Sequence, residues 1–128
     1  MQQLMARQEC KPVRKAVPAV KILPNITGLR TDDQLQDFLA RHKEETVLIN
    51  FGSSWCTHCH QMFPFFIALT KQFPELAYAV AQVDYMKDAV KGITYTPTFA
   101  VYKKGQKVDQ FYGAHHKQLA DHVWLHSS

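Results

Sequence analysis

Residues 46–60 read TVLINFGSSWCTHCH, an apolar run followed by a short turn and two cysteines. The run at 46–51 is rich in β-branched and apolar residues, which predicts a central strand that is buried on both faces. The Gly-Ser-Ser sequence at 52–54 indicates a turn, and an amphipathic helix is predicted to begin near Cys56. The sequence therefore places Cys56 and Cys59 at the junction of a buried strand and a helix.

The position and spacing of the two cysteines suit thiol–disulfide chemistry. At a helix N-terminus, unpaired backbone N–H groups and the helix dipole favour an anion, so the thiolate of Cys56 should form more readily than that of a free cysteine. Cys59 lies one turn further along and can reach the same sulfur. The pair can therefore close a disulfide, or open one by attack of Cys56 and resolution by Cys59.

The length and composition predict one compact domain. The chain has 128 residues, of which 46% are hydrophobic and 20% charged, so it can bury a single core. No window approaches the roughly 20 uninterrupted apolar residues of a membrane-spanning helix, and no apolar signal segment opens the chain. Three cysteines are too few for a disulfide-stapled secreted protein. We expect no membrane association and a cytoplasmic location, with a plastid or mitochondrion as alternatives.

The excess positive charge lies in the first 24 residues. The net charge is +4, and this segment holds one acidic residue, Glu9, against the basic residues Arg7, Lys11, Arg14, Lys15 and Lys21. The rest of the chain is neutral overall, so we expect no nucleic-acid partner. We interpret residues 1–19 as a flexible basic arm and 20–128 as the folded domain. Cys10, in the arm, is expected to be an unpaired thiol open to glutathionylation.

The remaining patterns predict an α/β architecture. Further strands are predicted at 19–23 and 76–84, followed by a hairpin of strands 98–102 and 107–112 that turns at Gly105. Helices are predicted at 32–43, from the cysteines to about 72, at 85–91 and at 116–125. This order implies a mixed β-sheet covered by helices on both faces.

From about Val20 to its end, the chain resembles the thioredoxins. The strand, the Trp-Cys-x-x-Cys motif at 55–59 and a proline five residues after the second cysteine, Pro64, match the family pattern. The sequence YTPTF at 95–99 looks like the family's cis-proline loop, and YKKG at 102–105 with FYGA at 111–114 looks like its C-terminal hairpin and glycine. The ending WLHS and the phrase YTPT are most similar to the divergent plant thioredoxin-like proteins of the three-three class.

The resemblance implies a thioredoxin-like fold with a central mixed sheet and a protein-disulfide oxidoreductase activity that needs no cofactor and no metal. It implies that Cys56 is the nucleophile and Cys59 the resolving thiol. Substrate backbone is expected to dock beside Thr96 and Pro97, with Trp55 forming part of that surface. The implied partners are proteins with disulfides and an electron donor, thioredoxin reductase or glutathione, in electron transport and cell redox homeostasis. We expect a monomer.

One departure from the family pattern is Asn50. Six residues before Cys56, thioredoxins typically carry a buried aspartate that helps to move the proton of the resolving thiol, and here the residue is an asparagine. The usual lysine partner of that aspartate is also absent from 76–84. Because an amide cannot titrate, we expect proton transfer from Cys59 to rely on water or another group, and the resolving step to be slower.

A second departure is His58, which stands where the family usually has a proline between the cysteines. In this respect the pair resembles the oxidising branch of the superfamily. An imidazole beside Cys56 can stabilise its thiolate and hence the reduced form, which makes the disulfide a better oxidant. We therefore expect a potential less reducing than the roughly −270 mV of thioredoxin. The alternative is that His58 is a solvated residue without a redox role.

Three other functions fit parts of the sequence. Residues 56–60 match the C-x-x-C-H pattern of covalent haem, but a buried strand before the motif is the wrong context. Cys56, Cys59 and His60 could contribute to a zinc site or, across a dimer, to an iron–sulfur cluster, although no second cysteine pair exists. A redox-inert module that binds partners through the same fold is the third alternative, and the two cysteines argue against it.

Overall fold

The computed structural model describes residues 19–113 and 115–127, so most of the predicted basic arm, with Cys10, lies outside the described residues. The strands are β2 (Val20–Leu23), β3 (Ile26–Leu29), β4 (Thr46–Gly52), β5 (Ala77–Gln82), β6 (Thr98–Lys103) and β7 (Gln106–Tyr112). The helices are α3 (Asp32–Arg41), α4 (Thr57–Gln72) and α5 (His116–His126), and a 3₁₀ turn spans Val83–Tyr85. None of the helices in the described part has the length and apolar character that a membrane span requires.

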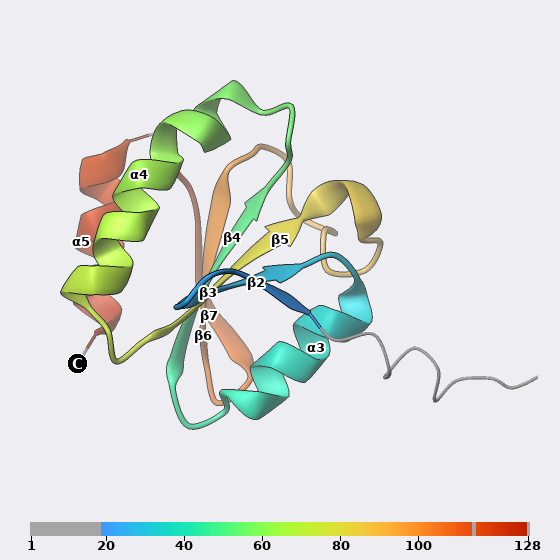
Figure 1. Ribbon diagram of the computed structural model, residues 1–128, viewed down its shortest axis with the longest axis horizontal. Coiled ribbons are helices and arrows are strands. Elements are labelled where there is room, and N and C mark those ends of the chain that lie inside the picture. Colours follow the sequence, from blue (N-terminus) through green and yellow to red (C-terminus); the bar gives the residue numbers. More distant parts are fainter. Residues whose placement is uncertain (1–18, 114, 128) are drawn as a thin grey trace, which may run out of the picture.

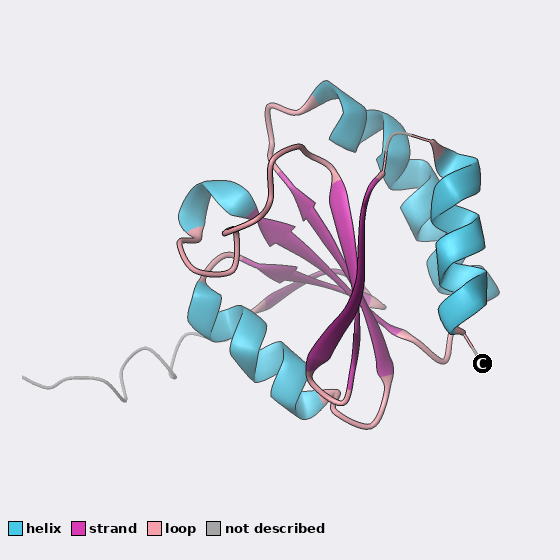
Figure 2. Ribbon diagram, turned by 180° about the vertical axis from the view of Figure 1, so that it is seen from behind, coloured by secondary structure: helices cyan, strands magenta, loops and turns pink. Residues whose placement is uncertain are grey.

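The strands form one mixed sheet in the order β2-β3-β5-β4-β6-β7. Strands β3, β5 and β4 run parallel, whereas β2, β6 and β7 pair antiparallel with their neighbours. Helix α3 covers one face of the sheet, and α4 and α5 lie together on the other (Figures 1 and 2). The predicted mixed sheet with helices on both faces is confirmed.

Strand β4 lies in the middle of the sheet and is buried along nearly its whole length, as predicted. Its side chains alternate between two cores because successive residues of a strand point to opposite faces. Val47, Ile49 and Phe51 pack in the core beneath α3, and Leu48 packs in the core beneath α4 and α5. By the same alternation, Asn50 points to the side of the sheet that carries α4. The buried amide of Asn50 is thereby placed on the side of the helix that carries the cysteines.

The predicted helix at 85–91 is wrong. After the 3₁₀ turn the chain runs through turns without helical pairing. The side chain of Asp32, at the start of α3, accepts hydrogen bonds from the backbone N–H groups of Lys87, Asp88 and Ala89. A single carboxylate thus satisfies three backbone donors of this segment, and it ties the loop to α3.

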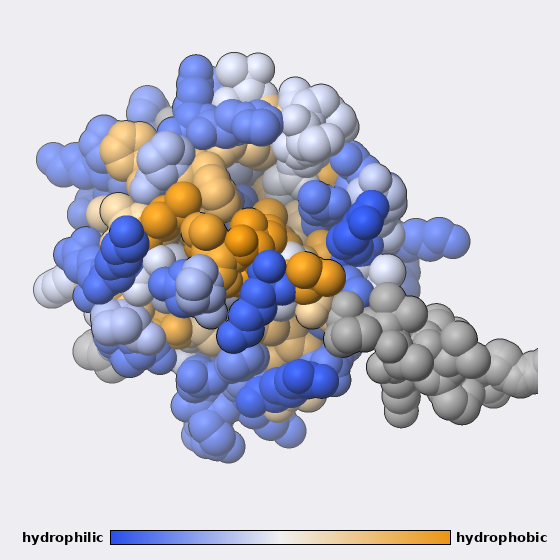
Figure 3. All heavy atoms as spheres, in the orientation of Figure 1, coloured by the Kyte–Doolittle hydropathy of each residue, from blue (hydrophilic) through white to orange (hydrophobic). Residues whose placement is uncertain are grey.

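The sequence analysis also missed strand β3. Its four residues include Gly28, which interrupts the apolar pattern, so no strand was predicted there. The glycine has a packing role, because a Cβ at this position would lie 3.1 Å from side-chain carbons of Ile22 on β2. Strand β2 forms one edge of the sheet, and its residues Val20 and Ile22 are 73% and 47% exposed. Figure 3, drawn in the orientation of Figure 1, shows apolar residues gathered near the middle of the view, where β2 and β3 lie in Figure 1.

Candidate active site

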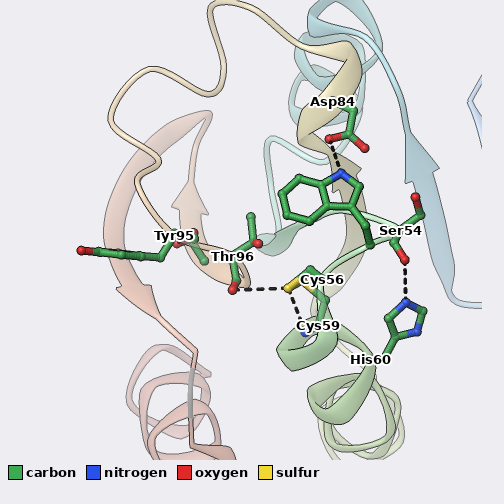
Figure 4. The surroundings of a disulfide bond; sticks show 9 residues. Ser54, Cys56, Cys59, His60, Asp84, Tyr95 and Thr96 are labelled. Atoms are coloured by element: carbon green, nitrogen blue, oxygen red, sulfur yellow. Dashed lines mark hydrogen bonds between the residues drawn. A yellow bond between two sulfur atoms is a disulfide. The ribbon is translucent and has the colours of Figure 1, made fainter.

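Cys56 and Cys59 form a disulfide at the N-terminus of α4, with their Cα atoms 5.2 Å apart (Figure 4). Cys56 is the N-cap residue of the helix, and its sulfur accepts a hydrogen bond from the backbone N–H of Cys59 at 3.1 Å. The strand-to-helix junction predicted from the sequence is therefore confirmed. A sulfur in this position faces the positive end of the helix dipole and a directed N–H donor, both of which favour a thiolate once the disulfide is reduced.

The loop containing Thr96 and Pro97 lies against the disulfide. The Thr96–Pro97 peptide bond is cis, as the resemblance implied. The carbonyl oxygen of Thr96 is 3.4 Å from the sulfur of Cys56, although the two residues are 40 positions apart in the chain. In the dithiol form, the Cys56 thiol can donate a hydrogen bond to this carbonyl. The contact leaves Cys56 only 7% exposed, although Trp55 and Thr57 on either side of it are exposed.

Trp55 is 72% exposed beside the disulfide, and its position is set by a residue that the sequence analysis did not single out. Its indole N–H donates to the Oδ1 atom of Asp84 at 3.2 Å. Asp84 lies in the 3₁₀ turn just after β5, and Trp55 follows β4, which is parallel to β5. Side chains that follow adjacent parallel strands meet at one edge of the sheet, and this rule could have identified Asp84 from the predicted strands.

Two tyrosines that the sequence analysis did not assign extend the exposed aromatic surface near the disulfide. Tyr95, just before Thr96, is 66% exposed, and Tyr112, at the end of β7, is 39% exposed. Their ring centroids are 5.6 Å apart. The side chain of Tyr95 points away from Cys56 and Cys59 (Figure 4). Exposed aromatic side chains therefore occur both next to Cys56 in the chain, at Trp55, and in the segment that precedes Thr96.

Behind Cys59, on the α4 side of the sheet, is a cavity of about 380 Å³. Its lining includes Asn50 of β4, Gln82 of β5 and, from the active-site segment, Ser53, Cys59 and His60. Asn50 is only 3% exposed and is paired in register with Val80 of β5, so it occupies the interior position expected for it. Among the described residues that line the cavity there is neither a carboxylate nor a lysine. Asn50 replaces the aspartate of the family pattern, and no lining residue of the cavity replaces that aspartate or its lysine partner.

The histidines near the motif have different positions. His58 is exposed in the first turn of α4, and within the described part of the chain no hydrogen bond joins it to Cys56. The Nε2 atom of His60 donates to the backbone carbonyl of Ser54 at 2.8 Å. His116 stacks on Phe65 of α4, with ring centroids 4.4 Å apart. The described residues contain no group of three or more His, Cys, Asp or Glu side chains placed to hold a metal ion.

Comparison with known proteins agrees with this geometry. A family model described as Thioredoxin matches residues 26–124. A protein of Arabidopsis thaliana called Thioredoxin-like 3-3 is 40% identical over 108 residues, which cover 84% of this chain and 82% of that protein. A protein of the same name from Oryza sativa subsp. japonica is 35% identical, covering 80% of this chain and 81% of its own. The X-ray structure of Fasciola hepatica thioredoxin superimposes with a TM-score of 0.73 at 31% identity, covering 77% of this chain and 97% of that one.

Proposed function

This chain belongs to the thioredoxin family and is a protein-disulfide oxidoreductase, and from this premise we propose that Cys56 is its nucleophile and Cys59 its resolving thiol. One observation carries the assignment of roles: the backbone N–H of Cys59 points at the sulfur of Cys56, at the positive end of α4. This arrangement stabilises a thiolate on Cys56 rather than on Cys59. Cys59, already bonded to Cys56 in the oxidised form, is within reach for the second step.

The proposed reaction transfers two electrons from the protein dithiol to a substrate disulfide. The Cys56 thiolate attacks one substrate sulfur, a mixed disulfide forms, and the other substrate sulfur leaves as a thiolate that takes up a proton. Cys59 then loses its proton and attacks the sulfur of Cys56, which releases the second substrate thiol. The protein ends as the disulfide and the substrate as the dithiol. The same steps in reverse oxidise a substrate dithiol.

We assign substrate binding to Trp55, Thr96 and Pro97. The exposure of Trp55 and the closeness of the Thr96 carbonyl to the Cys56 sulfur support this assignment. An extended peptide can pair with exposed backbone next to the disulfide, so that its own disulfide is presented to Cys56. The hydrogen bond from the N–H of Gly113 to the carbonyl of Pro97, 2.8 Å long, anchors the loop that would receive the peptide.

Partners and location are further parts of the proposal. We propose that the chain acts as a monomer in the cytoplasm, with a plastid or mitochondrion as alternatives, and that it takes part in electron transport for redox homeostasis. Its electron donor is thioredoxin reductase or glutathione. The low cysteine content supports a reducing compartment. The names of the plant relatives support a role shared with the thioredoxin-like proteins of the three-three class.

The experiment that tests this function is a midpoint-potential measurement by thiol trapping across a glutathione redox series. We expect a single two-electron transition in the full chain and its loss in the Cys59→Ser variant, because that variant cannot close the disulfide. The absence of a transition in the unmutated chain would instead support a redox-inert binding module. Bound metal or visible colour in the purified chain would support the metal or cluster alternative.

A further inference from the structure

The cavity behind Cys59 contains two buried polar atoms that lack partners. Neither Oδ1 of Asn50 nor Oγ of Ser53 has a hydrogen-bond partner among the described residues. The two residues are 3% and 7% exposed, and both line this cavity. Leaving a buried polar group without a partner costs about 1–3 kcal/mol. Two such atoms in one cavity therefore indicate that the cavity binds a polar group.

The resolving cysteine faces the same space. Gly52, at the end of β4, has no side chain, and a Cβ placed there would lie 3.1 Å from the sulfur of Cys59 and 3.7 Å from Oδ1 of Asn50. The sulfur and the amide oxygen therefore approach one point beside Gly52. Even an alanine at this position would press on the sulfur, so the missing side chain keeps the approach between Cys59 and the cavity open.

The chemistry of the resolving step requires a proton acceptor at this point. In the mixed disulfide Cys59 is a thiol, and it must lose its proton to become a nucleophile. The amide of Asn50 cannot accept that proton, whereas a water molecule with two or more polar partners is readily held in a cavity of this size. Of the other titratable groups nearby, Asp84 accepts from Trp55 and does not line the cavity. His60 lines the cavity and donates to the carbonyl of Ser54 through Nε2, which leaves its Nδ1 atom as the competing proton acceptor that His60→Gln tests below. His58 is exposed on the outer side of the turn.

We propose that Asn50 and Ser53 together hold a water molecule behind Cys59, and that Ser53 is a positioning residue for the resolving step. The water accepts a hydrogen bond from the Cys59 thiol and relays its proton to solvent as the thiolate forms. The thiolate attacks the sulfur of Cys56, the bond between Cys56 and the substrate breaks, and the departing substrate thiolate takes a proton from solvent. This inference rests on the proposed roles of Cys56 and Cys59, and it adds Ser53 to the residues of the reaction.

The test isolates the resolving step in the full chain carrying Cys10→Ser, so that only the two active-site thiols react. Reduced protein is mixed with an equal concentration of the chromogenic disulfide DTNB. The first thionitrobenzoate is released by attack of Cys56, and the second is released intramolecularly by Cys59. Because the second phase is independent of reagent concentration, its rate reports the resolving step alone.

We expect Ser53→Ala to slow the second phase about tenfold near pH 6, which is less than the roughly 10²–10⁴-fold of full general acid–base catalysis because Asn50 still contacts the water. The difference should shrink to less than about twofold near pH 10, because at high pH hydroxide removes the proton of the thiol without a positioned acceptor. Ser53→Thr keeps the hydroxyl and should restore the rate. The control is Thr57→Ala, which removes the hydroxyl of an exposed residue that does not line the cavity and should leave the rate unchanged at every pH.

A deficit in Ser53→Ala that is equal at all pH values would overturn the proposal, because it would show a purely structural effect. An unchanged rate in Ser53→Ala would also overturn the proposal. So would a slow second phase in Ser53→Thr, provided that this variant unfolds at the same urea concentration as the unmutated chain. So would a deficit that appears in His60→Gln and not in Ser53→Ala. If the unmutated chain shows no second phase, the proposed function itself fails, which is a distinguishable result.

Discussion

At the scale of single residues, Asn50 is the buried side chain that we expect to limit the rate of the resolving step. It lies beside the resolving cysteine with an amide where a carboxylate would be able to accept a proton. We expect Asn50→Asp to speed the resolving step at least several-fold at neutral pH, because a carboxylate can act as a general base for the Cys59 thiol. We also expect it to lower stability, because a buried carboxylate loses its hydration. The DTNB reaction measures the rate, and Asn25→Asp supplies the same change of charge at an exposed position. An unchanged rate in Asn50→Asp would show that the amide does not limit the step.

His58 tests whether an exposed residue between the cysteines tunes the redox potential. It is the second residue of α4, where a proline is tolerated because the backbone N–H there has no partner within the helix. We expect His58→Pro to make the midpoint potential more reducing, since it removes an imidazole that favours the thiolate of Cys56. Thiol trapping measures the potential, with Thr57→Ala as the control in the same turn. A shift toward a less reducing potential would contradict this mechanism.

At the scale of elements, one carboxylate joins the edge strand β7 to helix α5. Oδ2 of Asp109 is 2.7 Å from Nδ1 of His122 and 3.0 Å from Nε2 of His126. Burial raises the pKa of Asp109, but the hydrogen bonds and charges of the two imidazoles outweigh this effect and bring the pKa below its usual value. A carboxyl whose pKa is lowered by folding stabilises the fold above its unfolded pKa of about 3.9, and this contribution is lost as the pH falls through the folded value.

We therefore expect Asp109→Asn to lower the free energy of unfolding by about 1 kcal/mol at pH 7. The difference from the unmutated chain should narrow as the pH falls below about 4, where Asp109 becomes protonated in the unmutated chain as well. Urea unfolding at a series of pH values measures both effects. Asp121→Asn, on the exposed side of α5, is the matched control and should change stability little. If the difference in free energy of unfolding between Asp109→Asn and the unmutated chain stays constant down to pH 2, the negative charge of Asp109 does not stabilise the fold.

At the scale of the whole molecule, Gly113 couples the core to the active-site loop. Its N–H donates to the carbonyl of Pro97, and a Cβ at this position would lie only 2.0 Å from a ring carbon of Phe99. Phe99 is fully buried and packs between Phe66 of α4 and Phe111 of β7. The ring therefore cannot move aside without displacing both neighbours, and a side chain at Gly113 would push the end of β7 away from the loop.

We expect Gly113→Ala to destabilise the fold by about 3 kcal/mol, at the upper end of the cost of overpacking a core. The displaced Pro97 loop should also slow the reduction of a protein disulfide. Gly92→Ala is the control, because a Cβ there meets nothing within 4 Å and only the positive φ of +87° opposes it, at a cost of about 1 kcal/mol. Thermal unfolding and insulin reduction measure the two effects. Equal losses of stability in the two variants would show that contact with Phe99 is unimportant.

The elements with strong local patterns were predicted well. Helix α3 was identified by its capping residues, and in the structure Thr31 accepts from the N–H of Gln34 as the spacing indicates. Strand β4 was identified by its continuous apolar run, and the hairpin by Gly105, whose φ is +77°. The errors arose where tertiary contacts overrode local preference. Hydrogen bonds to Asp32 tie 87–89 to α3 in place of the predicted helix, and packing against Ile22 explains Gly28 in β3.

The sequence by itself determined that two cysteines stand where a buried strand passes into a helix, because apolar periodicity and turn residues act over a few neighbouring positions. It also identified Asn50 and His58 as departures from the family pattern. Only the tertiary structure decided that the Thr96 carbonyl lies against Cys56, 40 residues away, and that Asp84 holds Trp55. It alone placed the unpartnered oxygens of Asn50 and Ser53 in one cavity behind Cys59. Such contacts depend on how the sheet and its helices pack, and no local pattern in the chain encodes the distance between two side chains that packing brings together.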